Sequence, residues 1–266
     1  MKIAALPRLA ALLAAAFSLV VPANCAAQPN AVVLPPRGAG VDYQIGGPYA
    51  PPEGVRIVTR DHKVAPADGL YNICYVNAFQ TQPGGEDQWD PDLLLRDADG
   101  RPVVDEKWGE TLLDIRTVDK QTRIADKVNG WIDECAAERY QAVELDNYDS
   151  YDRSKKLLTT DQAQSYIRRL SGHAHDKGLA VAQKNAAELS NNHARNGLDF
   201  AVAEQCGDTG ECGDYVTAFS DNVIDVEYTD AGLAAACEQV GSRISIVQRD
   251  EDVVPAGASG YLRRTC

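Results

Sequence analysis

The chain has few histidines, the side chains that most often bind transition metals. Its 266 residues include four histidines, which are spread along the sequence as His62, His173, His175 and His193, and no Cys-x-x-Cys motif occurs. His173 and His175 are two residues apart in a stretch of helical pattern, so their side chains point away from each other. Helical metal ligands favour a spacing of four. We therefore expect neither a metal site nor a cofactor.

Positive charge is also scarce. The sequence has 26 basic and 39 acidic residues, which gives a net charge of −13 at pH 7. Residues 1–27 carry two basic and no acidic residues, so the rest of the chain has a net charge of −15. Such a chain is a poor partner for nucleic acid or anionic lipid and is better matched to a cationic ligand. Acidity that serves only solubility is the alternative interpretation.

The sequence contains a single long apolar run. Two basic residues, Lys2 and Arg8, precede an apolar run at 9–21, and small residues follow at 25–27. This pattern is typical of a cleaved signal peptide. The run is too short to span a bilayer, and no second run follows it. We predict a signal peptide at 1–27, a Pro- and Gly-rich flexible leader at 28–40, and a secreted monomer, extracellular or periplasmic, without a membrane span. A lipid anchor at Cys25 is the alternative.

Six cysteines follow residue 27, and an even number in an exported chain indicates disulfide bonds. The best supported pair is Cys206–Cys212, because these residues enclose a short Gly-rich loop. A Cys237–Cys266 bond would fasten the C-terminus and would leave Cys74–Cys135 as the third pair. Neither of these two pairs has local support in the sequence, so their pairing stays open.

Short segments that end in polar residues recur along the chain. Residues 142–146 place Val143 and Leu145 on one side and two acidic residues on the other, which is the period-two pattern of a strand. Strands that repeatedly end in polar groups are typical of a (β/α) barrel, whose active site lies at the C-terminal ends of its strands. The strand candidates are 41–45, 55–59, 70–76, 142–146, 179–184, 199–204, 223–228 and 243–248.

These candidates alternate with helices or loops, without internal repeats or an interdomain linker. We therefore predict one (β/α)8 TIM-type barrel over residues 41–266. Apolar periodicity predicts a helix over 118–139 and another from Thr160, as its cap, to a stop at Gly178. A long irregular segment, 77–110, follows the third strand. Since long loops inside compact domains are usually functional, we expect it to form a wall of a substrate groove.

Two carboxylic acids at different strand ends, Asp146 and Glu204, suggest glycoside hydrolysis. In that reaction one carboxyl group protonates the leaving oxygen while the other attacks the anomeric carbon or activates water. Asn147 and Lys184 are expected near Asp146 and would keep it ionised, so Asp146 suits the nucleophile. Glu204 follows apolar residues 201–203, which suits the acid/base. Structural ion pairs or loop caps are the alternative explanation for both residues.

The chain resembles a known family in seven blocks, which span residues 41 to about 250. The family is the endo-α-1,4-polygalactosaminidases, glycoside hydrolase family 114. The blocks are Asp-Tyr-Gln at 42–44, Ile-Cys-Tyr at 73–75, Leu-Asp-Ile-Arg at 113–116, Val-Glu-Leu-Asp-Asn at 143–147, Gln-Lys-Asn at 183–185, Glu-Gln-Cys at 204–206 and Val-Glu-Tyr at 226–228. The resemblance implies a (β/α)8 barrel and retaining, endo-acting hydrolysis of α-1,4-linked galactosamine polymers, with Asp146 and Glu204 as the catalytic pair. Leu145 stands where the family usually has proline, and the loop after Phe79 diverges, which affects the groove rather than the carboxylates.

A partly deacetylated galactosamine polymer is a cationic polysaccharide, which agrees with the acidic chain. The hypothesised substrate-binding residues are Asp42, Asp61, Tyr75, Asp114, Glu144, Asn147, Tyr148, Lys184, Asn185, Glu227 and Tyr228. The acidic members would bind ammonium or hydroxyl groups and the tyrosines would stack or hydrogen-bond, although Tyr75 is also explained by packing. Two other functions remain open: a polysaccharide-binding barrel without activity, and a glycosidase for a different amino-sugar polymer.

Overall fold

The computed structural model describes residues 1 and 32–266. The predicted signal peptide and the start of the predicted leader lie outside the described residues. All eight predicted strands are present, with ends within two residues of the predicted ones, and they pair in parallel in chain order. They are β1 (Gly40–Gln44), β2 (Val55–Asp61), β3 (Tyr71–Asn77), β6 (Ala142–Asp146), β7 (Ala180–Lys184), β8 (Phe200–Glu204), β9 (Val223–Glu227) and β10 (Ser245–Arg249).

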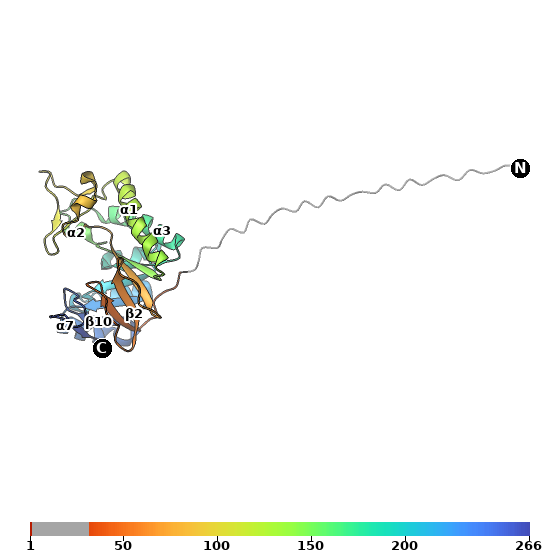
Figure 1. The fold of residues 1–266 in the computed structure, drawn as a ribbon, viewed down its shortest axis with the longest axis vertical. Coiled ribbons are helices and arrows are strands. Elements are labelled where there is room, and N and C mark those ends of the chain that lie inside the picture. The colour runs from red at the N-terminus through yellow and green to blue at the C-terminus, as the bar shows by residue number, and fades with distance from the viewer. Residues whose placement is uncertain (2–31) are drawn as a thin grey trace.

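The sheet curls until its first and last parallel strands meet (Figure 1). In the described part of the chain no main-chain ladder joins β1 to β10. Arginine side chains make the connection instead: Arg249 donates a hydrogen bond to the Tyr43 carbonyl, and Arg263 donates one of 2.9 Å to the Val41 carbonyl. Arg263 belongs to β11 (Arg263–Arg264), which pairs antiparallel with β10. The result is an α/β TIM-like barrel.

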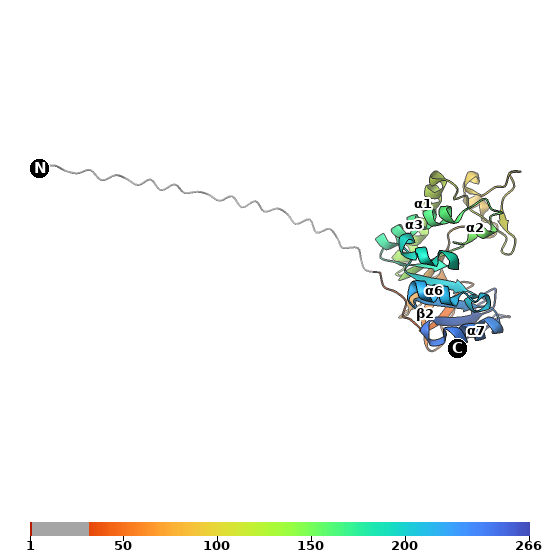
Figure 2. The same ribbon diagram turned by 180° about the vertical axis from the view of Figure 1, so that it is seen from behind.

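Helices cover this barrel unevenly, so the regular alternation of a (β/α)8 barrel is not followed. No helix lies between β1 and β2 or between β2 and β3, where the chain is fully described. The longest helices are α1 (Val118–Ala137) and α3 (Thr160–Asp176), and shorter ones cover the later strands (Figure 2). The shorter helices are α2 (Ser150–Arg153), α4 (His193–Asn196), α5 (Cys206–Thr209), α6 (Cys212–Phe219) and α7 (Asp230–Gln239).

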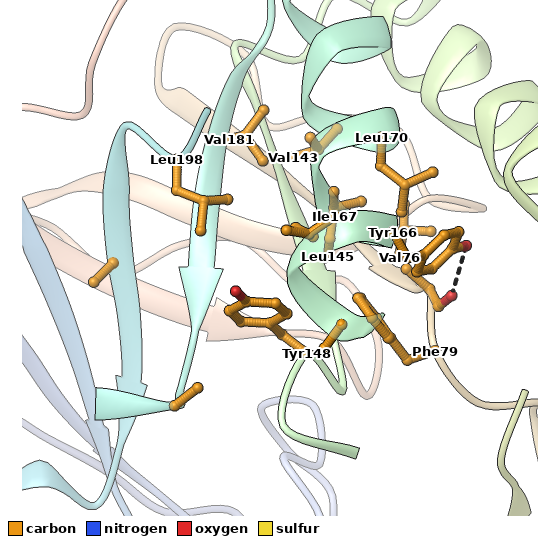
Figure 3. Packing of buried hydrophobic residues seen from close by; sticks show 14 of the residues in the cluster. Val76, Phe79, Val143, Leu145, Tyr148, Tyr166, Ile167, Leu170, Val181 and Leu198 are labelled. Atoms are coloured by element: carbon orange, nitrogen blue, oxygen red, sulfur yellow. Dashed lines mark hydrogen bonds between the residues drawn. The ribbon is translucent and has the colours of Figure 1, made fainter. Parts of the chain in front are cut away.

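The start of α3 differs by one residue from the prediction. Thr159, not Thr160, is the N-cap, and its side chain accepts a hydrogen bond from the Gln162 amide while the Gln162 side chain bonds back to the Thr159 amide. This reciprocal pair is a capping box, which satisfies two amide groups that the helix itself leaves free. Tyr166, Ile167 and Leu170 then lie on the buried face of α3 and pack toward the strands (Figure 3).

Two apolar layers position the site. One fills the barrel interior and includes Val41, Ile73, Phe200 and Val247. The other lies between the strands and the helices, where Val143 and Leu145 of β6 are completely buried. Successive strand residues therefore belong to alternate layers, as the period of two requires. The inward-facing positions near the C-terminal strand ends are the ones left for polar side chains.

The segment between β3 and α1, residues 78–117, forms secondary structure of its own. It contains two 3-10 turns, η1 (Glu86–Gln88) and η2 (Pro91–Leu93), and a hairpin of β4 (Val104–Asp105) and β5 (Glu110–Thr111). In Figure 1 it is the orange-to-yellow region beside α2. Leu95, Val103 and Leu112 are fully buried within it, so this segment has apolar packing of its own.

Three disulfide bonds join Cys206–Cys212, Cys74–Cys135 and Cys237–Cys266. The first was predicted from its short loop. The other two pairs are left open by the sequence, which suggests Cys237–Cys266 as a tie for the C-terminus and Cys74–Cys135 as the remaining pair. They tie β3 to α1 and α7 to the C-terminal residue. Among residues 1 and 32–266, no helix combines the length and apolar character needed to cross a membrane.

Candidate active site

Inward-facing side chains at the C-terminal strand ends surround a cavity of about 430 Å³. Tyr75 from β3, Asp146 from β6, Lys184 from β7 and Glu204 from β8 lie on its wall, and Tyr228 follows directly after β9. Each belongs to the same period-two series as the residues that fill the barrel interior below it. The fold thus brings together residues that are up to 153 positions apart in the sequence.

Lys184 is the central residue of the site. Its side chain is 1% exposed, and its Nζ lies 2.9 Å from Glu144 Oε1, 3.1 Å from Asp146 Oδ1 and 3.5 Å from Glu204 Oε2. A buried ammonium group is unfavourable without partners. Burial alone would lower the pKa of Lys184, but the surrounding carboxylates outweigh burial and raise it well above its usual value. Lys184 therefore carries a positive charge in the centre of three acidic groups.

Asp146 is held in its ionised form. Burial alone would raise its pKa, but the Lys184 ammonium, the Tyr75 hydroxyl and the Asn147 amide together lower it. The Tyr75 hydroxyl donates to Asp146 Oδ2 at 2.5 Å. Ionisation is the state that a carboxylate nucleophile needs.

Glu204 has polar neighbours instead of the apolar setting that its preceding residues suggested. The Tyr228 hydroxyl donates to Oε1 at 2.5 Å, and Asn185 Nδ2 donates to Oε2 at 3.1 Å. The Glu204 amide in turn donates to Asn185 Oδ1 at 2.8 Å. The apolar side chains before Glu204 lie within the strand layers, away from its carboxyl group.

The chain turns sharply after three neighbouring strands, and this orients the site. Asn147, Asn185 and Gln205 directly follow β6, β7 and β8, and their φ angles are 67°, 50° and 60°. This left-handed region is uncommon for residues other than glycine and is best tolerated by asparagine. The turn at Asn185 lets its side-chain amide both donate to and accept from Glu204.

The two predicted catalytic carboxylates share one cation. Asp146 Oδ1 and Glu204 Oε2 both contact Lys184 Nζ, at 3.1 and 3.5 Å, so the two oxygens are no farther apart than the sum of these distances. Retaining glycosidases place their carboxyl groups about 5–5.5 Å apart, and inverting ones about 6.5–9.5 Å apart. The upper limit set by Lys184 lies at the short end of the inverting range.

The other predicted site residues divide into two groups. Asp61, Asn147 and Asn185 line the cavity with the residues above. Glu144 lies one strand repeat deeper and is fully buried under Lys184, so it supports the ammonium without reaching the cavity. Burial raises the pKa of Glu144.

Asp42 and Glu227 do not contribute to the cavity, because each faces outward from its strand. Asp42 accepts hydrogen bonds from the Tyr49 hydroxyl at 2.9 Å and from Arg263 Nε at 3.2 Å. Glu227 accepts one from the Gly207 amide at 2.6 Å. Asp42 therefore fastens the β1–β2 loop and β11 to the barrel, and Glu227 fastens the start of α5.

Asp114 and Tyr148 also lie away from the cavity. Asp114 is 1% exposed and is paired with Arg116 at 2.7 Å and Lys120 at 2.5 Å. Tyr148 is completely buried beside Phe79, and its hydroxyl accepts a hydrogen bond from Asn196 (Figure 3). Asp114 is thus part of a structural ion cluster and Tyr148 is part of the core, so the subsite roles predicted for both are not supported.

The sequence interpretation missed several residues of the site. Tyr43 donates to Glu144 Oε1 at 2.6 Å and accepts from Lys184 at 3.1 Å, so it closes the network from β1. Glu110 and Trp108, from the β4–β5 hairpin, and Arg153, from α2, line the cavity. Burial raises the pKa of Glu110 to about 7. The period-two pattern of β1 places Tyr43 on the inward face and could have predicted it. The irregular segment 78–117 has no such pattern, so nothing in the sequence indicates Glu110.

One group of possible metal ligands has its donor atoms close together in the part of the chain that the structure describes: Cys206, Cys212 and Asp225. The two cysteines are bonded to each other, so neither offers a thiolate.

Two carboxylates lie on separate strand ends of a TIM-like barrel and share one buried ammonium group, an arrangement compatible with the paired carboxyl groups of glycoside hydrolysis. The sequence model of glycoside-hydrolase family GH114 matches residues 21–266, so the chain belongs to this family. The protein is therefore a glycoside hydrolase. A comparison with curated proteins found no match.

Solved structures show the same fold at low sequence identity. Ega3 of Aspergillus fumigatus, in complex with galactosamine, is 22% identical with a TM-score of 0.70, over 89% of this chain and 98% of that one. The glycoside hydrolase domain of PelA from Pseudomonas aeruginosa is 13% identical with a TM-score of 0.57, over 83% of this chain and 98% of that one.

Proposed function

We propose that the protein is a secreted, retaining endo-glycosidase that hydrolyses α-1,4-linked, galactosamine-containing exopolysaccharide. The observation that carries the proposal is the pair Asp146 and Glu204, which share the Lys184 ammonium at the cavity. Residues 1–27 would be the signal peptide, 28–40 the leader and 41–266 the catalytic domain, which acts as a monomer. Three disulfide bonds are consistent with an oxidising compartment.

In the proposed reaction Asp146 Oδ attacks the anomeric carbon while Glu204 gives its proton to the departing glycosidic oxygen. The carbon–oxygen bond to the leaving sugar breaks, and a covalent ester forms between Asp146 and the remaining sugar. Glu204, now ionised, removes a proton from water, and the resulting hydroxide attacks the same carbon and releases Asp146. The hydrogen bonds from Tyr75 and Tyr228 position the two carboxyl groups.

The substrate assignment is supported by charge and by similarity. An acidic cavity attracts a polymer that carries ammonium groups, and Asp61, Asp105 and Glu110 are among the acidic residues around this one. Ega3, which shares the fold, was solved with galactosamine bound. The family match supports the reaction type.

The test is release of soluble oligosaccharides from a partly deacetylated α-1,4-galactosamine polymer, measured by mass spectrometry. We expect release by the unaltered protein, almost none by Glu204→Gln, and normal release by Glu53→Gln, an exposed position in the β1–β2 loop. Proton NMR of the first products would show retained anomeric configuration. If the proteins bind the polymer but none releases oligosaccharides, a polysaccharide-binding barrel without activity is favoured. If oligosaccharides are released only from another amino-sugar polymer, the proposed substrate is wrong.

A further inference from the structure

The β4–β5 hairpin extends to the cavity and carries a third acidic group close to the catalytic pair. Glu110 on β5 lines the cavity and is 9% exposed. Its Oε2 accepts hydrogen bonds from Asn77 Nδ2 at 3.0 Å and from Asn147 Nδ2 at 3.4 Å. Asn147 is the residue directly after Asp146, so Glu110 is linked to the proposed nucleophile through one side chain.

The second carboxylate oxygen of Glu110 is available for a ligand. Within residues 32–266 no side-chain or main-chain donor bonds to Oε1, and Oε1 is not among the buried oxygens that are sealed off without a partner. Two amides therefore fix the orientation of the carboxyl group, while one oxygen faces accessible space. This arrangement is typical of a group that is held ready to accept a hydrogen bond.

Among residues 32–266, no basic side chain forms a salt bridge with Glu110. The strongest charge effects on it come from Asp146 of β6, Asp105 of β4 and Arg153 of α2. Arg153 is already paired, with Asp105 at 2.8 Å and with Asp149 at 2.9 Å. Burial first, and then the two neighbouring carboxylates, raise the pKa of Glu110 to about 7. A ligand that brings a positive charge to the cavity would supply the missing partner.

We propose that Glu110 binds the ammonium group of a galactosamine unit beside the cleaved bond and thereby selects deacetylated over N-acetylated sugar. The proposal rests on the function proposed above. An N-acetyl group is neutral and bulkier than an ammonium group, and it offers one amide N–H in place of three charge-assisted donors. Glu110 would therefore discriminate between the two sugars by charge as well as by size.

The test measures protons released on binding. Because burial raises the pKa of Glu110 to about 7, its carboxyl group would hold a proton at pH 6, and pairing with an ammonium group would release that proton. Galactosamine hexasaccharide would be titrated calorimetrically into Glu204→Gln protein at pH 6, in buffers with different heats of ionisation. We expect release of up to about one proton per bound oligosaccharide.

The matched variants are Glu110→Gln and Glu106→Gln, each added to Glu204→Gln. Glu106 is exposed on the same hairpin and does not line the cavity. Glu110→Gln should abolish the proton release and weaken binding of the deacetylated hexasaccharide by roughly tenfold or more. Binding of the N-acetylated hexasaccharide should stay the same. Glu106→Gln should change neither quantity, and Glu110→Asp, which keeps the carboxyl group, should retain proton release.

Two results would overturn the proposal: proton release that persists in Glu110→Gln, or an unchanged ratio of affinities for the two hexasaccharides. If the unaltered protein still cleaves the polymer in that case, only the role of Glu110 fails. If the unaltered protein neither cleaves nor binds the deacetylated polymer, the proposed function and the role of Glu110 fail together. Circular dichroism of each variant separates these outcomes from loss of the fold.

Discussion

Replacing Lys184 and Glu144 together tests what keeps Asp146 ionised. Lys184→Met alone would leave Glu144, which is 0% exposed, without its cation. An unpaired buried charge is strongly destabilising. The double variant Lys184→Met/Glu144→Gln removes both charges and leaves Asp146 with the hydrogen bonds from Tyr75 and the Asn147 amide.

The expected size of the effect follows from the geometry. Lys184 Nζ lies 3.1 Å from Asp146 Oδ1 and is 1% exposed, so solvent screens the pair little. Opposite charges at about 4 Å interact by about 4 kcal/mol at an effective dielectric constant of 20. The pKa of Asp146 is lowered chiefly by this ammonium, against the effect of burial. Its loss should move the acidic limb of the pH–rate profile upward by roughly 1–3 pH units, the usual effect of an opposite charge.

The measurement is kcat/KM for a soluble galactosamine oligosaccharide between pH 3 and 8, because this quantity reports ionisation in the free enzyme. Both proteins carry Glu110→Gln, since Glu110 would titrate in the same range. Stability should change in the same sense. The pKa of Asp146 is lower in the folded protein than in the unfolded chain, where it is about 3.9. This difference stabilises the fold at pH values above about 3.9, and the stabilisation is lost as the pH falls through the lowered pKa. An active double variant whose acidic limb coincides with that of the unaltered protein would refute the role given to Lys184.

Two further predictions concern single contacts. Tyr228→Phe removes the 2.5 Å hydrogen bond to Glu204 and should lower kcat about 10- to 100-fold. This range corresponds to about 1.5–3 kcal/mol for a hydrogen bond to a charged group, and the denaturation midpoint should change little. An unchanged kcat would contradict the positioning role of Tyr228. Replacing both cysteines of Cys74–Cys135 with alanine should cost about 4 kcal/mol in urea unfolding, against about 2 kcal/mol for Cys206–Cys212, because the bonds span 61 and 6 positions. Equal losses would show that chain entropy does not dominate.

The strand pattern predicts which of several residues lie at the cavity, and the same pattern explains why others lie away from it. Asp146 and Glu204 were assigned to the ends of strands that the structure contains. Asp42 and Glu227 were chosen for their charge, although the inward-facing residues are their neighbours Tyr43 and Tyr228. Residues next to each other in a strand face opposite sides. Strict use of this rule selects Tyr43 on β1 in place of Asp42, and it keeps Tyr228, which is among the predicted residues, without Glu227.

The rest of the site depends on tertiary structure that the sequence does not display. Glu110 and Trp108 reach the cavity because residues 78–117 form a hairpin with its own apolar packing, and that segment has no period to follow. The polar surroundings of Glu204 come from Asn185 and Tyr228, on two other strand ends. Residues adjacent in the sequence therefore gave a false impression of an apolar environment, because the barrel brings other neighbours to the carboxyl group.

The arginine connection between β1 and β10 has a consequence for synthesis of the chain. The Val41 and Tyr43 carbonyls on β1 are made early during translation, yet the donors that satisfy them belong to Arg263 and Arg249. Until those residues leave the ribosome, β1 can pair with β2 but cannot complete its other edge. Tyr43 also contacts Lys184, so the strand that these arginines fasten carries one residue of the Lys184 network. A nascent chain that stops before Arg249 would hold the strands from β1 to β9, with this edge of β1 still open.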